Sequence, residues 1–295
     1  MRHKTIIMLS KQSKWVLLIL LSLIWGSSFI LIKRGLVGLS PLQLGSLRMI
    51  FAATFLLIIG FNSLKNIRQH QWKYIALTAF MGTFFPAYLF SIAQTEIDSS
   101  VSAILNSLTP LGTLILGAFV FGLSFQRRQL FGVIIGLIGC VLLVLNGAVN
   151  HPGQNYWYAT LAILGAICYA VNVNLIKKYL SDVNPLSITT GNFAVLLIPA
   201  TIILFCTDFM EIAHQSEVQT SMLFVGVLAV MGTCIANVLY FRLIQISSPI
   251  FASSVTYMLP LVAIFWGVLD NESLSAIQFL GGFIVLVGVY LSARK

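Results

Sequence analysis

The sequence predicts an all-α membrane protein of ten transmembrane helices, arranged as two inverted five-helix repeats with both termini in the cytoplasm. Three observations predict this fold: the composition, ten long apolar runs and the distribution of the basic residues. Of the 295 residues, 58% are apolar and only 8% are charged, and the mean hydropathy is +0.96. Soluble domains usually carry about a quarter charged residues, so these charges cannot cover a water-facing globule. The same composition excludes a disordered chain.

The apolar runs are long enough to span a bilayer, whose hydrocarbon core of about 30 Å needs about 20 residues of helix. Short connections between the runs hold most of the charges. Strands are excluded because an open sheet edge cannot lie in lipid. In chain order, the runs are Trp15–Ile32, Leu42–Phe61, Trp72–Ala93, Ser99–Phe121, Gln129–Gly147, Trp157–Ile176, Leu186–Cys206, Ser221–Ile244, Ile250–Leu269 and Ala276–Ser292.

The first run follows four basic residues, as the apolar part of a signal peptide does: Arg2, Lys4, Lys11 and Lys14. The run is too long for a signal peptide, lacks a small-residue cleavage site and is followed by nine more runs. We therefore expect an uncleaved signal anchor.

The basic residues predict the orientation of the helices, because cytoplasmic loops of membrane proteins are enriched in Lys and Arg. With the N-terminus in the cytoplasm, all but three of the 17 Lys and Arg lie on that side; Lys33 and Arg34 lie outside and Arg48 lies within a run. Of the eight acids, only Asp182 lies inside. We expect a multi-pass protein of the bacterial inner membrane. The net charge of +9 then reflects topology, and no nucleic-acid partner is expected.

The two halves of the chain repeat one another. Pro41-Leu42 matches Pro185-Leu186 at an offset of 144, and Gly82-Thr83 matches Gly232-Thr233 at an offset of 150. The repeats comprise residues 15–147 and 157–292, with five runs each. Because five is odd, the second repeat enters the membrane from the opposite side. Inverted repeats are typical of transporters, although a duplication kept only for packing is the alternative.

Several short motifs occur in a fixed order along the two halves: Trp25-Gly26-Ser27-Ser28-Phe29, Arg48, Pro260, Glu272-Ser273-Leu274, Gln278, Gly281-Gly282 and Gly288. In these motifs the chain resembles the EamA-type permeases of the drug/metabolite transporter superfamily. The chain departs from the usual pattern at Gly122-Leu123-Ser124 and at Tyr169-Ala170. The resemblance implies export of small metabolites such as amino acids, by alternating access through a central cavity, with the fifth and tenth helices as an outer scaffold.

The fourth run carries a polar stripe in which Ser99, Ser102, Asn106, Thr109 and Thr113 share one helical face. Polar side chains at membrane depth must meet protein or water. The stripe therefore either lines a pathway or forms hydrogen bonds between helices.

Arg48 is the only charged residue well inside a run. An intramembrane Arg is costly and usually faces a cavity or a partner. It either contacts an anion or carboxylate, or bonds to helix-end carbonyls and extends toward the headgroups. With this residue, the candidate substrate-binding residues are Trp25, Ser28, Arg48, Tyr88, Ser102, Asn106, Pro110, Tyr169, Asn172, Asn237, Tyr257 and Pro260.

The fifth and tenth runs are rich in Gly, which lets helices approach closely. We expect these glycines to serve packing, with dimerisation through the same faces as the alternative, so that the protein is a monomer or a homodimer. The residues are Gly132, Gly136 and Gly139 in the fifth run and Gly281, Gly282 and Gly288 in the tenth.

Enzyme chemistry is not expected, because the four His lie in loops or the tail and no catalytic, metal or cofactor motif is present. No Asp, Glu or His lies within a run, so a proton relay at membrane depth is not expected either. The expected partners are a small-molecule substrate and the lipid bilayer. An importer, a facilitated exchanger or, as the rival class, a membrane scaffold without a substrate fit the same pattern.

Overall fold

The computed structural model describes residues 2–97, 102, 105–148, 156–259, 261–262 and 276–293, and every element within these ranges is helical. The elements η3 and η5 are π-helices, and the other η elements are 3₁₀ helices. In chain order, the elements are α1 (Arg2–Gly35), α2 (Pro41–Gly60), η1 (Phe61–Asn66), η2 (Gln69–Gln71), α3 (Trp72–Ala79), η3 (Phe80–Phe84), α4 (Phe85–Ala93), α6 (Thr109–Phe119), α7 (Arg127–Ala148), η4 (Tyr156–Tyr158), α8 (Ala159–Tyr179), α9 (Pro185–Phe205), α10 (Phe209–Ile212), α11 (Ser216–Val227), η5 (Leu228–Ile235), α12 (Ala236–Ile246), α13 (Pro249–Ser253) and α15 (Ala276–Ala293).

Six helices in the described ranges are long and apolar enough to cross a membrane. Two shorter apolar helices, Thr109–Phe119 and Pro249–Leu259, lie within the fourth and ninth apolar runs, while α7 and α15 cover most of the fifth and tenth. The all-helical membrane fold is thus confirmed. The six long apolar helices are Ser13–Gly35, Pro41–Asn66, Gln69–Ala93, Ala159–Tyr179, Pro185–Phe205 and Ser216–Ile246.

Large apolar side chains cover the outside of the bundle. Phe119 is 87% exposed, and Ile58 and Leu223 are 78% and 73% exposed. Soluble monomers rarely expose apolar surface so extensively, because water penalises it. In a bilayer the same side chains face lipid, so the surface agrees with the composition.

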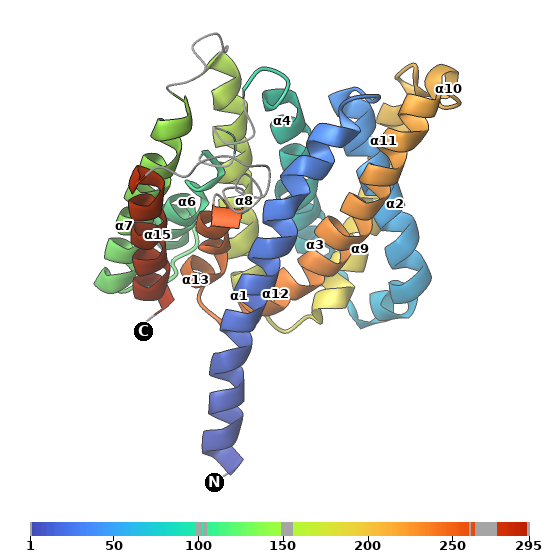
Figure 1. Ribbon diagram of the computed structural model, residues 1–295. Helices are drawn as coiled ribbons and strands as arrows, with labels where there is room; N and C mark the ends of the chain where they lie inside the picture. The colour runs from blue at the N-terminus through green and yellow to red at the C-terminus, as the bar shows by residue number, and fades with distance from the viewer. Residues whose placement is uncertain are drawn as a thin grey trace.

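The two halves of the chain interleave. In Figure 1, α7 and α15 lie at one side, α2, α10 and α11 at the other, and α1, α8 and α12 between them. The helix pairs α2 with α9, α1 with α12, α4 with α8 and α7 with α15 are in contact, and each pair joins the first half to the second. The contact of α1 with α12 and that of α8 with α4 are equivalent under the internal repeat. The middle of the bundle is therefore built from both halves.

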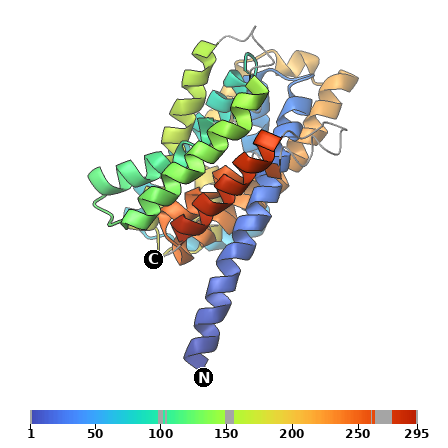
Figure 2. The ribbon, with the colours of Figure 1, turned by 60° about the vertical axis from the view of Figure 1, so that its left-hand side comes forward.

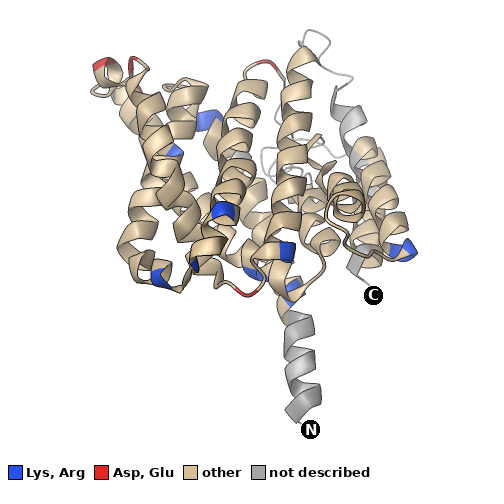
Figure 3. Ribbon diagram, turned by 180° about the vertical axis from the view of Figure 1, so that it is seen from behind, with Lys and Arg blue, Asp and Glu red and all other residues tan. Residues whose placement is uncertain are grey.

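The charges divide between the two ends of the bundle. Figure 3 shows most of the coloured Lys and Arg in the lower half and most of the Asp and Glu at the upper end. α1 begins and α15 ends toward the same lower end (Figure 1). At this end Lys177 Nζ donates to three backbone carbonyls at the C-terminus of α12, and the shortest of these bonds is 2.7 Å, to the carbonyl of Ser247. A basic residue here therefore also stabilises a helix C-terminus.

The repeated Pro-Leu pairs begin equivalent helices. Pro41 is the first residue of α2, where Ser40 and Gln43 form a capping box: the Gln43 N–H donates to Ser40 Oγ at 3.3 Å and the Ser40 N–H to Gln43 Oε1 at 2.8 Å. Pro185 is the first residue of α9, capped by Asn184. Proline is favoured at a first helical position, because its missing N–H needs no partner there.

Glycines on α7 and α15 let these two helices touch through their backbones (Figure 2). A Cβ at Gly139 would lie 2.7 Å from the backbone nitrogen of Val285, and a Cβ at Gly288 would collide with the backbone of Gly136. The glycine faces therefore meet one another within the chain. This arrangement agrees with the packing interpretation and leaves Gly136, Gly139 and Gly288 no free face for a second copy.

We predict that Gly288→Ala destabilises the protein, because the added methyl group forces α7 and α15 apart; overpacking of this kind costs about 1–3 kcal/mol. Gly226→Ala in α11 is the matched control, since no atom lies within 4 Å of its added Cβ. The control gains helix propensity and keeps or raises its melting temperature. Thermal unfolding of both variants in detergent measures the difference, and equal melting temperatures would contradict the close contact.

Candidate functional site

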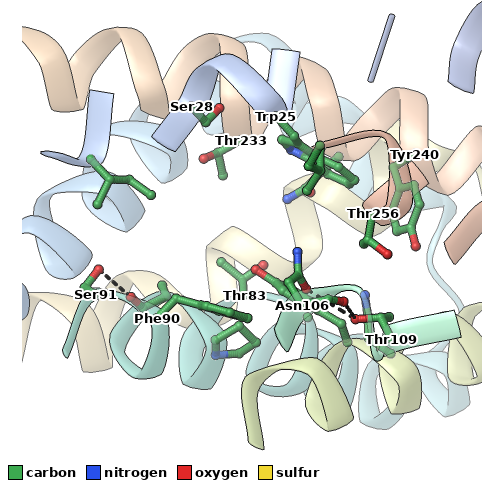
Figure 4. A pocket seen from close by; sticks show the side chains of 18 of the residues that line it. Trp25, Ser28, Thr83, Phe90, Ser91, Asn106, Thr109, Thr233, Tyr240 and Thr256 are labelled. Carbon is green, nitrogen blue, oxygen red and sulfur yellow. Dashed lines mark hydrogen bonds between the residues drawn. The ribbon is translucent and has the colours of Figure 1, made fainter. Parts of the chain in front are cut away.

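A cavity with about 110 Å³ of space open to water lies in the middle of the bundle, between elements of both halves. One water molecule needs about 10–15 Å³ of such space, so the cavity has room for a small solute. Figure 4 shows Trp25, Ser28, Thr233 and Tyr240 on one side, opposite Thr83, Phe90, Ser91 and Asn106. The lining residues are Trp25, Ser28, Ile32, Arg48, Gly82, Thr83, Pro86, Ala87, Phe90, Ser91, Gln94, Asn106, Thr109, Tyr169, Asn172, Thr233, Asn237, Tyr240, Thr256 and Leu259.

The π-helix η5 positions polar groups on one side of the cavity. Its hydrogen bonds span five residues, as in the bond from the Ala236 N–H to the carbonyl of Met231. The Thr233 hydroxyl donates to the carbonyl of Leu228 at 3.2 Å, again five residues back. The carbonyl of Gly232 accepts a bond of 2.9 Å from the indole N–H of Trp25. The irregular turn thus orients Trp25 from the other half of the chain.

The π-helix η3 occupies the equivalent position in the first half. Pro86 has no N–H to offer the carbonyl of Gly82, four residues earlier, which interrupts the α-helical pattern. The N–H of Phe85 donates to the carbonyl of Phe80 instead, a five-residue step. π-Helical turns occur frequently at functional sites. Here Gly82 and Thr83 both line the cavity.

Arg48 on α2 is the charged residue among the lining residues that the structure describes. Its Nε donates a hydrogen bond of 2.7 Å to Thr233 Oγ1 on η5. The interpretation that Arg48 bonds to helix-end carbonyls is not what the structure shows, because the recorded bond goes to a side chain at the cavity. Arg48 therefore brings a positive charge to the cavity.

Two aromatic pairs flank the polar groups. The rings of Trp25 and Tyr240 meet edge to face with centroids 4.8 Å apart, and those of Phe90 and Tyr169 stack with centroids 5.8 Å apart and planes 18° apart. Such contacts hold aromatic side chains in fixed positions. Each pair again joins the two halves, so the cavity has two apolar surfaces beside its polar groups.

Seven of the twelve residues predicted from the sequence line the cavity. The cavity lies among α1, α2, α4, α6, α8 and α12 together with both π-helices, which is why residues distant in the sequence meet there. The seven are Trp25, Ser28, Arg48, Asn106, Tyr169, Asn172 and Asn237.

Four of the others are not among the lining residues. The Tyr88 hydroxyl lies 2.8 Å from Ser46 Oγ, and the Tyr257 hydroxyl donates to the carbonyl of Val133 on α7 at 3.0 Å. Ser102 is fully buried, and Pro110 is buried in the first turn of α6. These side chains serve contacts between helices or the start of a helix. The twelfth residue, Pro260, lies outside the described residues.

The polar stripe of the fourth run lines the cavity only in part. Asn106 and Thr109 line the cavity. Thr113 is only 1% exposed and packs against α8, where its backbone carbonyl accepts a bond of 3.0 Å from Asn174 Nδ2. The Thr113 hydroxyl has no hydrogen-bond partner among the described residues, so this position fits neither of the two roles proposed for the stripe. Ser99 lies outside the described residues.

The predicted set omits several lining residues, among them Thr83, Gln94 and Thr233. The repeated Gly-Thr pairs, Gly82-Thr83 and Gly232-Thr233, were the signal that could have identified two of them. A pair that recurs in both halves of an inverted repeat is expected to face the interface between them. Gln94 follows the end of α4, and its position in the sequence carries no comparable signal.

The model of the EamA-like transporter family matches the chain twice, at residues 13–145 and 156–294. The chain is 28% identical to the inner membrane transporter YedA of Escherichia coli K12, over 93% of this chain and 89% of YedA. It is 25% identical to a probable amino-acid metabolite efflux pump of the same strain, over 94% and 93% of the two chains. A solved crystal structure with 16% identity shares the fold, with a TM-score of 0.74 over 95% of this chain and 96% of that one.

We predict that a Cys substituted for Asn106 reacts with small water-soluble thiol reagents, whereas a Cys substituted for Thr113 does not. Both positions lie on one face of one segment, but only the first lines the cavity. The native cysteines 140, 168, 206 and 234 are first replaced by Ala, and labelling rates are followed by mass spectrometry. Equal labelling rates at the two positions would show that lining the cavity does not determine whether the reagent reaches a position.

Proposed function

The chain belongs to the EamA-like transporter family, and from this premise we propose that it moves small metabolites, such as amino acids, across the bacterial inner membrane by alternating access through the cavity. It is a membrane transporter rather than an enzyme. The similarity to a probable amino-acid metabolite efflux pump supports export of such compounds.

One observation carries the proposal: the cavity is lined from both halves of the chain, with a π-helix of each half at its wall. A site between two repeats can open to one side of the membrane when they tilt one way and to the other when they tilt back. The interleaved helix pairs supply two equivalent contacts that can exchange, α1 with α12 and α4 with α8.

We propose that the chain consists of two repeats, residues 15–147 and 157–292, each with five membrane-spanning helices and of opposite orientation, and that groups of helices rock around the cavity. α7 and α15 form the rigid scaffold in this mechanism, because their backbones touch at the glycines. The sequence offers no intramembrane acid or His, so the transporter works by facilitated diffusion or exchange, or couples to a proton carried by the substrate.

We predict that both termini are cytoplasmic, because most of the Lys and Arg lie in the segments that this orientation places in the cytoplasm. A reporter fused after Lys295 and one inserted into the Asp208–Glu217 connection then report opposite compartments. A phosphatase active only in the periplasm, paired with a fluorescent protein that folds only in the cytoplasm, makes the measurement. The same compartment for both fusions would contradict the ten-helix topology.

Counterflow of radiolabelled metabolites in proteoliposomes tests transport itself. We predict that Thr83→Trp abolishes counterflow, because the indole fills the cavity that Thr83 lines. Thr54→Trp is the matched control, since Thr54 is exposed on the outer face of α2. Size-exclusion chromatography checks that both variants fold.

The outcomes separate the alternatives. Full activity of Thr83→Trp would move the pathway away from this cavity. Flux by the parent protein only down a gradient of the substrate indicates facilitated exchange or import. No flux of any metabolite in a wide panel would favour a scaffold protein without a substrate.

A further inference from the structure

We propose that the cavity binds a small organic carboxylate at Arg48 and rejects amines of the same size. The inference rests on the transport function proposed above and names the charge of the substrate. It is carried by the position of Arg48, by two buried polar atoms without partners and by the aromatic surfaces.

Arg48 is not neutralised by any acid in the described part of the chain. The ion pair found there joins Arg68 to Asp182, at the end of the bundle, where both side chains are more than half exposed. The sequence places no Asp or Glu within any apolar run. A positive charge taken out of water without a partner is strongly unfavourable, so a bound anion would stabilise this arrangement.

The guanidinium of Arg48 keeps donors free for such an anion. It carries five N–H groups in a planar fork. The Nε–H is directed to Thr233 Oγ1 at 2.7 Å, and within the described residues Arg48 makes no other hydrogen bond. The planar terminal nitrogens match the two oxygens of a carboxylate, which can bind them through two parallel hydrogen bonds.

Two further polar atoms at the cavity are buried and have no hydrogen-bond partner among the described residues. Gln94 Nε2 is a donor and Asn172 Oδ1 is an acceptor, and both side chains line the cavity. A buried polar group without a partner is costly, so each of these atoms would gain from a hydrogen bond to a ligand in the cavity. Gln94 offers a second donor to an anion, and Asn172, 3% exposed, accepts from a hydroxyl or N–H of the substrate body.

The aromatic pairs Trp25–Tyr240 and Phe90–Tyr169 supply surfaces for an apolar body. An inorganic anion would leave these surfaces without a contact, so the substrate is an organic acid. An amine of the same shape meets the positive charge of Arg48, and no lining residue described here carries a negative charge to pair with it. The cavity therefore separates solutes by charge.

The test compares two reagents of equal length and opposite charge, 2-carboxyethyl and 2-aminoethyl methanethiosulfonate. Each reacts with Asn106→Cys in the background without the four native cysteines, and each rate is divided by the rate of the same reagent with free 2-mercaptoethanol, an uncharged thiol. We expect the carboxylate reagent to have the higher normalised rate, by at least about tenfold, because a positive charge a few ångströms away attracts one reagent and repels the other strongly enough for such a ratio even at the dielectric constant of water.

Three variants assign the preference to Arg48. Arg48→Gln removes the preference, and Arg48→Lys retains it because the charge remains. Arg34→Gln removes the same charge from an exposed position at the end of α1 and leaves the preference unchanged. The Asn106→Cys protein with Arg48 intact gives the ratio of the two normalised rates without any change at Arg48. This ratio decides the sign of the preference even if Arg48→Gln does not fold.

The outcomes distinguish this inference from the proposed function. A normalised ratio at or below one, or a ratio equally high in Arg48→Gln, overturns the carboxylate assignment and leaves transport through the cavity intact. Failure of Asn106→Cys to react with either reagent, or with uncharged methyl methanethiosulfonate, shows a cavity closed to water. That result contradicts the proposed function itself, and with it this inference.

Discussion

Within a bilayer, each backbone group that leaves the helical hydrogen-bond pattern must find a partner inside the protein, and the cavity of this protein depends on how the chain meets that constraint. The π-helices η3 and η5 depart from the α-helical pattern at equivalent positions in the two halves. In η5, the carbonyl of Gly232 accepts from Trp25, and Thr233 accepts from Arg48. The same departure that costs regular bonds therefore positions an aromatic and a charged side chain.

The duplication of the chain explains why these groups meet. A helix of the first half contacts a helix of the second in each of the main pairs, so the middle of the bundle belongs to neither repeat alone. The contact between α7 and α15 holds one side of the bundle together through glycine backbones. In the mechanism proposed above, this pair is the scaffold and the pairs around the cavity exchange contacts.

The polar content of the cavity differs between the halves, although the backbone is repeated. Arg48 corresponds to Asn192 at the offset of 144 that relates Pro41 to Pro185. Asn192 is fully buried and pairs with Thr78 at 2.9 Å, away from the cavity. The repeat thus keeps the architecture symmetric while one positive charge makes the cavity asymmetric.

The sequence by itself determined the membrane class, the helical segments and the duplication, and it identified seven of the residues at the cavity, because hydropathy and charge act locally along the chain. It also identified Arg48, because a charge at membrane depth is costly and usually faces a cavity or a partner. Only the tertiary structure decided that Thr113 packs against α8 while Asn106 lines the cavity, and that Tyr257 bonds to α7. Helical spacing gives the face of a residue, but the neighbour that covers each turn of that face depends on how the helices cross, which is a property of the assembled bundle.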